Sequence, residues 1–142
     1  MYLVINRNEL ILHETFFIAA QKEAIKSKCL RRKCGAVLVR YGKVIGSGFN
    51  SPPGNLESQR RRSVSKDSLH EKVTDKTCCV HAERRALIDA LKKGYDVSRT
   101  VMYFTSVDET GNRLISGEPY CTDCSKTVLD EKVKEWVLEH DR

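Results

Sequence analysis

Apolar residues recur along this chain with two different spacings. Where they return every three or four residues, as Phe17, Ala20 and Ala24 do, they predict an amphipathic helix. Where β-branched residues form a short run after a glycine, as in residues 36–39, they predict a strand. By these criteria we expect helices over Glu9 to Lys28, His81 to Lys93 and Cys121 to Glu131, and strands over residues 36–39, 44–49, 100–105 and 133–138.

The order of these elements indicates the fold class. The turn residues Tyr41-Gly42-Lys43 join the first two strands into an antiparallel hairpin. A helix precedes each of the later strands and returns the chain to the same edge, which makes the last strands parallel. The order therefore predicts an α/β sandwich. Gly46 and Gly48 in the second strand indicate a bulge, or a close approach of the backbone to something bound.

The length and composition favour one folded domain over residues 1–142, with 40% hydrophobic residues. Within it, residues 51–76 contain two prolines and few apolar positions, which is typical of a long basic loop. The run Arg60, Arg61 and Arg62 in this loop suits a phosphate clamp, because guanidinium groups bind phosphate in a bidentate manner. A solvated, mobile loop is the alternative.

The net charge indicates the kind of partner, and the expected compartment indicates the role of the cysteines. Lysine and arginine number 25 against 19 acidic residues, a net charge of +6, which favours an anionic partner such as a nucleotide or a nucleic acid. No apolar run approaches the roughly 18 residues of a membrane span, and no signal peptide is recognisable, so we expect a cytoplasmic protein without a membrane partner. In a reducing compartment, six cysteines are more typical of metal ligands, catalytic thiols or buried side chains than of disulfides.

Two short motifs carry the candidate chemistry, and each opens a predicted helix. They are Cys79-Val80-His81-Ala82-Glu83 and Pro119-Tyr120-Cys121-Thr122-Asp123-Cys124. Cys121 and Cys124 can place two thiolates on one tetrahedral Zn²⁺, and His81 supplies a third ligand that leaves one coordination position for water. Helix N-termini stabilise thiolates, and zinc lowers the pKa of its bound water to about 7.

Glu83 is the candidate proton carrier. On an ideal helix it lies about 200° around the axis from His81, so it is not expected as a fourth ligand. In the first turn its carboxylate can instead lean over the open position and move a proton from water to a leaving nitrogen. Taken singly, His81 and Glu83 also fit an ordinary solvated helix start, and Cys-x-x-Cys fits a structural zinc site or a redox dithiol. Their combination favours a catalytic zinc.

The sequence His81-Ala82-Glu83 followed by Pro119-x-Cys121-x-x-Cys124 resembles the zinc signature of the cytidine and nucleotide deaminase superfamily. Segments 33–39, 46–54 and 81–87 resemble, in that order, its deoxycytidylate deaminase branch, so the resemblance covers about residues 14 to 138. It implies the cytidine deaminase-like fold, a three-layer α/β/α sandwich with a mixed β-sheet. It also implies an assembly of identical chains.

The resemblance implies roles for individual residues. Glu83 would be the proton shuttle, the N–H of Ala82 would meet the carbonyl of the base, and Asn50 would contact the sugar or its phosphate. Water would attack C4 of cytosine and ammonia would leave. The expected substrate is deoxycytidylate, with cytidine, guanine or adenosine in tRNA as alternatives for the same chemistry. A zinc-stabilised nucleic-acid-binding module without catalysis is the alternative of another class, and in it Glu83 would be dispensable.

The chain departs from the family pattern in three places. Tyr120 separates Pro119 from Cys121, although the family usually has proline directly before that cysteine. Residues 107–118 form an extra hairpin-like segment, which we expect at the rim of the pocket, where it would influence substrate choice. The chain also stops soon after the last predicted strand, so either the sheet is shorter or Tyr2-Leu3-Val4-Ile5 supplies a replacement strand.

The remaining cysteines allow a second metal. Some deoxycytidylate deaminases hold a second, structural zinc, which here would use Cys29 or Cys34 with His70 and Cys78 or Cys79. No spacing rule fixes such a site. We therefore expect one catalytic zinc, with one or two of these cysteines simply buried.

Overall fold

The structure is a computed structural model, and it describes residues 2–6, 11, 13–60, 79–115 and 122–140. The regular elements are β1 (Tyr2–Asn6), α1 (Glu14–Ile25), β2 (Lys33–Arg40), β3 (Lys43–Phe49), the short 3-10 turns η2 (Pro53–Asn55) and η3 (Glu57–Gln59), α2 (Ala82–Lys92), β4 (Val101–Val107), β5 (Arg113–Leu114), α3 (Thr122–Asp130) and β6 (Glu135–His140). Among the described helices, none combines the length and the hydropathy of a bilayer-spanning segment.

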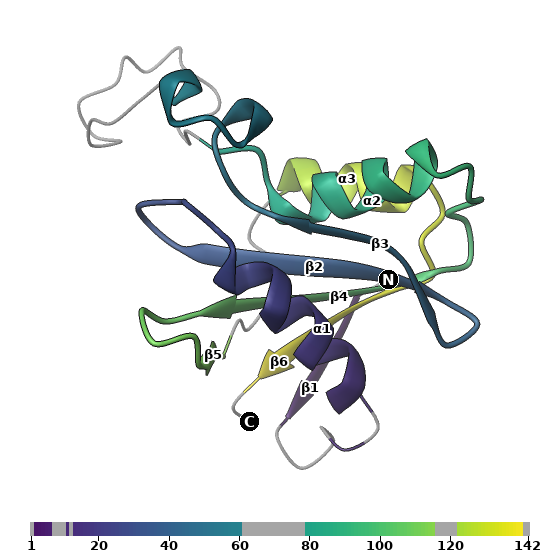
Figure 1. The fold of residues 1–142 in the computed structure, drawn as a ribbon. Coiled ribbons are helices and arrows are strands. Elements are labelled where there is room, and N and C mark those ends of the chain that lie inside the picture. The colour runs from purple at the N-terminus through teal and green to yellow at the C-terminus, as the bar shows by residue number, and fades with distance from the viewer. Residues whose placement is uncertain (1, 7–10, 12, 61–78, 116–121, 141–142) are drawn as a thin grey trace.

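The strands form one mixed sheet in the order β1-β6-β4-β2-β3, with β5 paired to β4 (Figure 1). β6 runs parallel to both β1 and β4. β2 runs antiparallel to both β3 and β4. The predicted hairpin and the predicted parallel pairing of the last strands are both confirmed.

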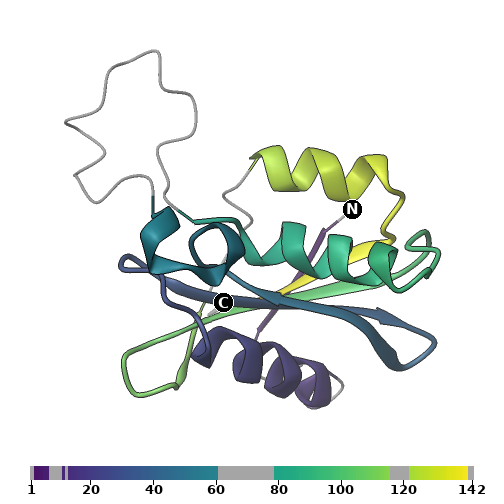
Figure 2. The ribbon, with the colours of Figure 1, turned by 45° about the horizontal axis from the view of Figure 1, so that its top comes forward.

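Helices cover both faces of the sheet (Figure 2). α1 packs on one face, where Phe17 and Ala20 meet Val37, Tyr103 and Val137. α2 and α3 pack on the other face, and their core includes the alternate strand residues. These are Ala36, Leu38, Ile45, Met102, Trp136 and Leu138. Because successive side chains of a strand point to opposite faces, β2 contributes to both cores. The predicted three-layer α/β/α sandwich is confirmed.

The N-terminal strand settles the alternative that the sequence left open. β1 adds to the outer side of β6, with Tyr2 opposite Trp136 and Asn6 opposite His140. The segment Tyr2-Leu3-Val4-Ile5 therefore does supply a strand. The helix expected over Glu9 to Lys28 is observed only from Glu14 to Ile25.

Helix α2 lies unusually close to strand β3. A Cβ atom on Gly48 would stand 2.8 Å from the carbonyl oxygen of Ala82, and one on Gly46 would stand 2.3 Å from that of Ala86. The register between β2 and β3 also shifts after Leu38, so the predicted bulge is present. The close approach that these glycines permit is to a helix of the same chain.

The outer side of β3 is also held by α2. The main-chain N–H of Ser47 donates to a carboxylate oxygen of Asp89 at 3.0 Å. Lys93, one turn further along the helix region, pairs with the same carboxylate at 3.0 Å. An amide of this edge strand therefore already has an acceptor within the chain.

The described part of the segment at residues 107–118 is a hairpin, as predicted. β5 pairs antiparallel with the end of β4. The hairpin leans on α1, because the Gln21 side chain donates to the carbonyl of Gly111 at 2.8 Å and Arg113 donates to Glu14 at 2.8 Å. Residues 116–118 lie outside the described part, and the position of the segment at the rim of the pocket stays a prediction.

Candidate metal centre and active site

The N-terminal ends of α2 and α3 bring two predicted metal ligands together. His81 occupies the N-cap position of α2 in extended conformation, while Cys124 lies in the first turn of α3 and is buried. Nδ1 of His81 stands 3.1 Å from Sγ of Cys124. Cys121, the third predicted ligand, lies outside the described residues. In the described part of the chain, no group of three possible ligands is complete.

The donor set fits zinc. Two ligands at the usual Zn–S and Zn–N lengths and a tetrahedral angle stand about 3.5 Å apart, which is close to the separation of His81 and Cys124. Imidazole nitrogen and thiolate sulfur are both ligands that zinc prefers. A further thiolate from Cys121 would make three protein ligands and leave one position open.

Glu83 lies beside these two ligands, His81 and Cys124. Its side chain is buried and accepts hydrogen bonds from its own main-chain N–H and from the thiol of Cys124. Burial raises the pKa of Glu83 above its ordinary value, while these two hydrogen bonds and the charge of His81 oppose the rise. The cluster therefore contains a carboxyl group that holds a proton more readily than an exposed glutamate.

The angle of about 200° expected for regular helix does not apply to this pair, because ψ of His81 is 146° and the helix begins at Ala82. The chain turns between the two side chains, so Glu83 reaches Cys124 and leans toward the ligands. Ala82 itself is buried at the first helical position, where a main-chain N–H has no acceptor within the helix.

Asn50 is buried and braces the loop between α1 and β2. Its Oδ1 accepts from the hydroxyl of Ser27 at 2.6 Å and from the N–H of Cys34 at 2.8 Å. Its Nδ2 donates to the carbonyl of Arg32 at 2.7 Å. These contacts use three of the four hydrogen-bonding positions of the amide. The bracing role was not foreseen from the sequence, because it joins residues up to 23 positions apart.

Arg85 was also missed by the sequence analysis. It lies one turn after His81, and its guanidinium binds the segment that carries Asn50, including the carbonyls of Phe49 and Pro52, both at 3.0 Å. A basic residue in a helix normally faces solvent, so nothing local distinguished it. Its neighbour Arg84 forms an ion pair with Asp123 and thereby links α2 to α3 beside the metal ligands.

Cys29 and Cys79 meet in a second thiol cluster. The thiol of Cys79 donates to Cys29, whose sulfur also accepts from the N–H groups of Arg31 and Arg32. Burial raises the pKa of Cys29, but these hydrogen bonds and the nearby charge of Arg60 outweigh burial and lower it below its ordinary value. Burial instead raises the pKa of Cys34 to about 12.

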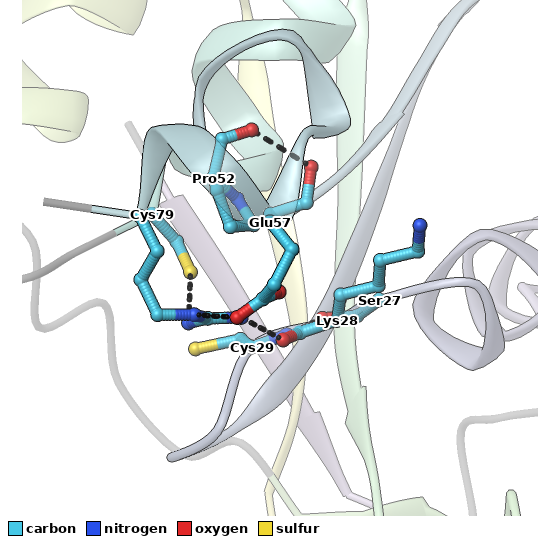
Figure 3. A network of polar contacts seen from close by, with 8 residues as sticks. Ser27, Lys28, Cys29, Pro52, Glu57 and Cys79 are labelled. Atoms are coloured by element: carbon cyan, nitrogen blue, oxygen red, sulfur yellow. Dashed lines mark hydrogen bonds and ion pairs between the residues drawn. The ribbon is translucent and has the colours of Figure 1, made fainter. Parts of the chain in front are cut away.

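The guanidinium of Arg60 lies in this second cluster, beside Lys28, Glu57 and Cys79, which Figure 3 labels. Its guanidinium pairs with both carboxylate oxygens of Glu57, donates to the carbonyl of Lys28 at 2.8 Å and lies 4.0 Å from Sγ of Cys79. Only 6% of its side chain is exposed. Arg60 therefore braces the loop in this structure, while Arg61, Arg62, His70 and Cys78 lie outside the described residues.

Comparison with known proteins agrees with this geometry. The model of the family described as the cytidine and deoxycytidylate deaminase zinc-binding region matches residues 11–140. The deoxycytidylate deaminase of Saccharomyces cerevisiae is 33% identical over 76 residues, and that of Schizosaccharomyces pombe is 35% identical over 79 residues. Each match covers 53% of this chain and 24% of the relative, so this chain spans only a part of their length.

Solved structures share the fold. The dCMP deaminase of cyanophage S-TIM5, in complex with dCMP and dUMP, has a TM-score of 0.64 at 22% identity and covers 92% of this chain and 83% of its own. The cytidine deaminase of Burkholderia pseudomallei has a TM-score of 0.54 at 22% identity over 82% of this chain and 74% of its own. At these identities the likeness shows a common architecture.

Proposed function

Because the chain belongs to the family of cytidine and deoxycytidylate deaminase zinc-binding regions, we propose that it catalyses the hydrolytic deamination of a cytosine nucleotide, with deoxycytidylate converted to deoxyuridylate. One observation carries the proposal. The imidazole of His81, the thiol of Cys124 and the carboxyl group of Glu83 meet where α2 and α3 begin. A structural zinc site would not need a buried carboxyl group beside its ligands.

The described residues suggest a division of labour. His81 and Cys124, with Cys121, would hold zinc, which when bound supplies a water molecule with a pKa of about 7. Glu83 takes a proton from the water that adds to C4 of the base and delivers it to the exocyclic nitrogen, so that a C4–O bond replaces the C4–N bond and ammonia leaves. The raised pKa of Glu83 suits both steps, because the group must hold the proton between them. The N–H of Ala82 donates to the carbonyl oxygen of the base.

The hydrogen bonds of Asn50 restrict what it can contact on a substrate. Its Oδ1 accepts from the N–H of Cys34 and shares the single hydroxyl proton of Ser27 with the main-chain carbonyl of Asn50. One N–H of Nδ2 remains, which can donate but not accept. Asn50 therefore binds an acceptor oxygen, as on a phosphate or a sugar hydroxyl.

We further propose a single zinc per chain. A second ion at Cys29 and Cys79 would lie beside the guanidinium of Arg60, 4.0 Å from Sγ of Cys79, and a dication is repelled there. Metal analysis of the purified protein is expected to give about one zinc per chain. A value near two that falls to one in Cys29→Ser would contradict this count.

The activity is tested by ammonia release from a panel of substrates at equal concentration. The panel contains deoxycytidylate, deoxycytidine, cytidine, guanine and a tRNA carrying the candidate adenosine. We expect the highest kcat/KM with deoxycytidylate and formation of deoxyuridylate in equal amount to ammonia. If zinc-loaded protein releases no ammonia from any member but binds nucleic acid, the chain is a binding module instead.

A further inference from the structure

The guanidinium of Arg85 binds a single segment of the chain, residues 49–52. Nη1 donates to the carbonyl of Phe49 at 3.0 Å and to the hydroxyl of Ser51. Nη2 donates to the carbonyls of Ser51 at 3.3 Å and Pro52 at 3.0 Å. The guanidinium thus grips the turn after β3 on both sides of Ser51.

This turn connects the segment that carries Asn50 with the segment that carries the metal ligand His81. Ser51 is fully buried, and its carbonyl accepts the N–H of Val80 at 2.9 Å, which forms an isolated bridge between residues 51 and 80. Val80 directly precedes His81, while Asn50 directly precedes Ser51. The position of Ser51 therefore affects the positions of both His81, a predicted metal ligand, and Asn50, the proposed substrate contact.

Although its neighbour in the sequence, Arg84, pairs with Asp123, Arg85 forms no ion pair among the described residues. Its partners are neutral oxygens, and its guanidinium carbon also lies 5.9 Å from the centre of the Phe49 ring. A planar group with five donors can bind several carbonyls at once, which lysine cannot reproduce. The contacts therefore depend on the shape of arginine and not only on its charge.

We propose that Arg85 is a positioning residue of the active site, which acts through Ser51 to fix Asn50 relative to Glu83. The proposal rests on the proposed deaminase function. Arg85 extends from the same helix as Glu83, two residues further on, so its grip ties the Asn50 turn to the helix that carries the proton shuttle. Val80 has its own main-chain hydrogen bond to Ser51, which an Arg85 substitution does not remove. The position of His81 therefore depends less on the guanidinium than the position of Asn50 does.

The kinetic test compares Arg85→Gln and Arg85→Lys with Arg40→Gln. Arg40 offers a matched control, because it also donates to a carbonyl across the fold, that of Asp96 at 2.6 Å, without contacting the residues of the site. Arg85→Gln is expected to raise KM for deoxycytidylate by about 10- to 100-fold while kcat and bound zinc change much less. Arg85→Lys is expected to give an intermediate KM, and Arg40→Gln a KM like that of the parent chain.

A second measurement does not depend on activity. Hydrogen exchange is followed at the N–H of Cys34, which donates to Asn50 at 2.8 Å, and at the N–H of Val80. In Arg85→Gln both are expected to exchange faster than in Arg40→Gln, with the Cys34 amide more affected. Unchanged exchange and an unchanged KM in a folded Arg85→Gln or Arg85→Lys variant overturn the proposal, as does an equal loss of kcat and zinc with KM preserved. Failure of the parent chain to release ammonia from any substrate would refute the proposed function instead.

Discussion

Glu83 is a carboxyl group enclosed by the helix that begins just before it and by the thiol of Cys124. Burial raises its pKa above the ordinary value, because burial removes the water that would stabilise the charge. The ordinary glutamate of a helix start would be ionised and would serve only to complement the helix dipole. A buried carboxyl group with a raised pKa suits the proton transfer that we propose for Glu83.

Replacement of Glu83 by glutamine tests this role. Glutamine keeps the size of the side chain but cannot carry a proton between water and a leaving nitrogen. Deamination of deoxycytidylate is expected to fall by about 10²- to 10⁴-fold or more, which is the usual contribution of a general acid–base group. Zinc content, measured on the same sample, is expected to stay unchanged. Full ammonia release by zinc-loaded Glu83→Gln would contradict the mechanism.

The sequence could predict the residues of this cluster because their pattern is local. His81 and Glu83 stand two positions apart, and Cys124 belongs to a Cys-x-x-Cys pair, so each motif is readable within a few residues. The roles of Asn50 and Arg85 were not readable in this way. Arg85 contacts residues 33 to 36 positions away, and only the folded chain brings these partners together.

At the scale of elements, the site depends on how closely α2 lies against β3. Gly48 faces the first turn of α2, where a Cβ atom would meet the carbonyl of Ala82 and the N–H of Ala86, both at 2.8 Å. These are main-chain atoms of a regular helix, which cannot move aside singly. The glycine thereby sets the distance between the sheet and the helix that carries Glu83.

Gly48→Ala is therefore expected to be destabilising. The added methyl group forces α2 outward, and overpacking of this kind costs about 1–3 kcal/mol. The free energy of unfolding is measured with urea, with Ser47→Ala as the control in the neighbouring position. Because the shift occurs at the start of α2, deamination by the folded Gly48→Ala protein should fall as well. A stability equal to that of Ser47→Ala would show that the helix adapts freely.

The sequence predicted the type and order of most elements, and the reasons are physical. Short β-branched runs such as residues 36–39 favour strands in any context that buries them. The strand at Tyr2–Asn6 could only be stated as an alternative, because its partner β6 lies more than 130 residues away. The glycines of β3 predicted a close approach of the backbone but not that α2 is the element that approaches, since the pattern of one strand does not identify what packs on it.

At the scale of the whole molecule, Arg113 ties three elements of the α1 face together. Its guanidinium binds Glu14 of α1 and lies 3.0 Å from a carboxylate oxygen of Glu139 in β6. Glu139 is almost fully buried, whereas the side chain of Glu14 is 39% exposed. The buried pair carries most of the energetic consequence, because a charge without its partner is costly in the interior.

Arg113→Met is accordingly expected to destabilise the fold by about 3–5 kcal/mol, since it leaves the charge of Glu139 buried without its partner. The double variant Arg113→Met with Glu139→Gln should recover part of this loss. Glu14→Gln serves as the control and should change stability little, because its carboxylate is partly solvated. Urea unfolding of the parent chain, of Arg113→Met, of Glu139→Gln and of the double variant gives the coupling energy. Additive effects of the Arg113 and Glu139 substitutions would show that the pair is not coupled.

The carboxylate of Asp89 has a consequence for how this sheet ends. A border strand normally offers its amides to any extended peptide nearby, and this is a route to aggregation. At Ser47 the amide is already engaged by Asp89, and Lys93 holds that carboxylate in place. An incoming strand must first break both contacts. Two molecules that meet at this edge are therefore expected to associate through side chains. Continued addition of strands to the sheet is disfavoured.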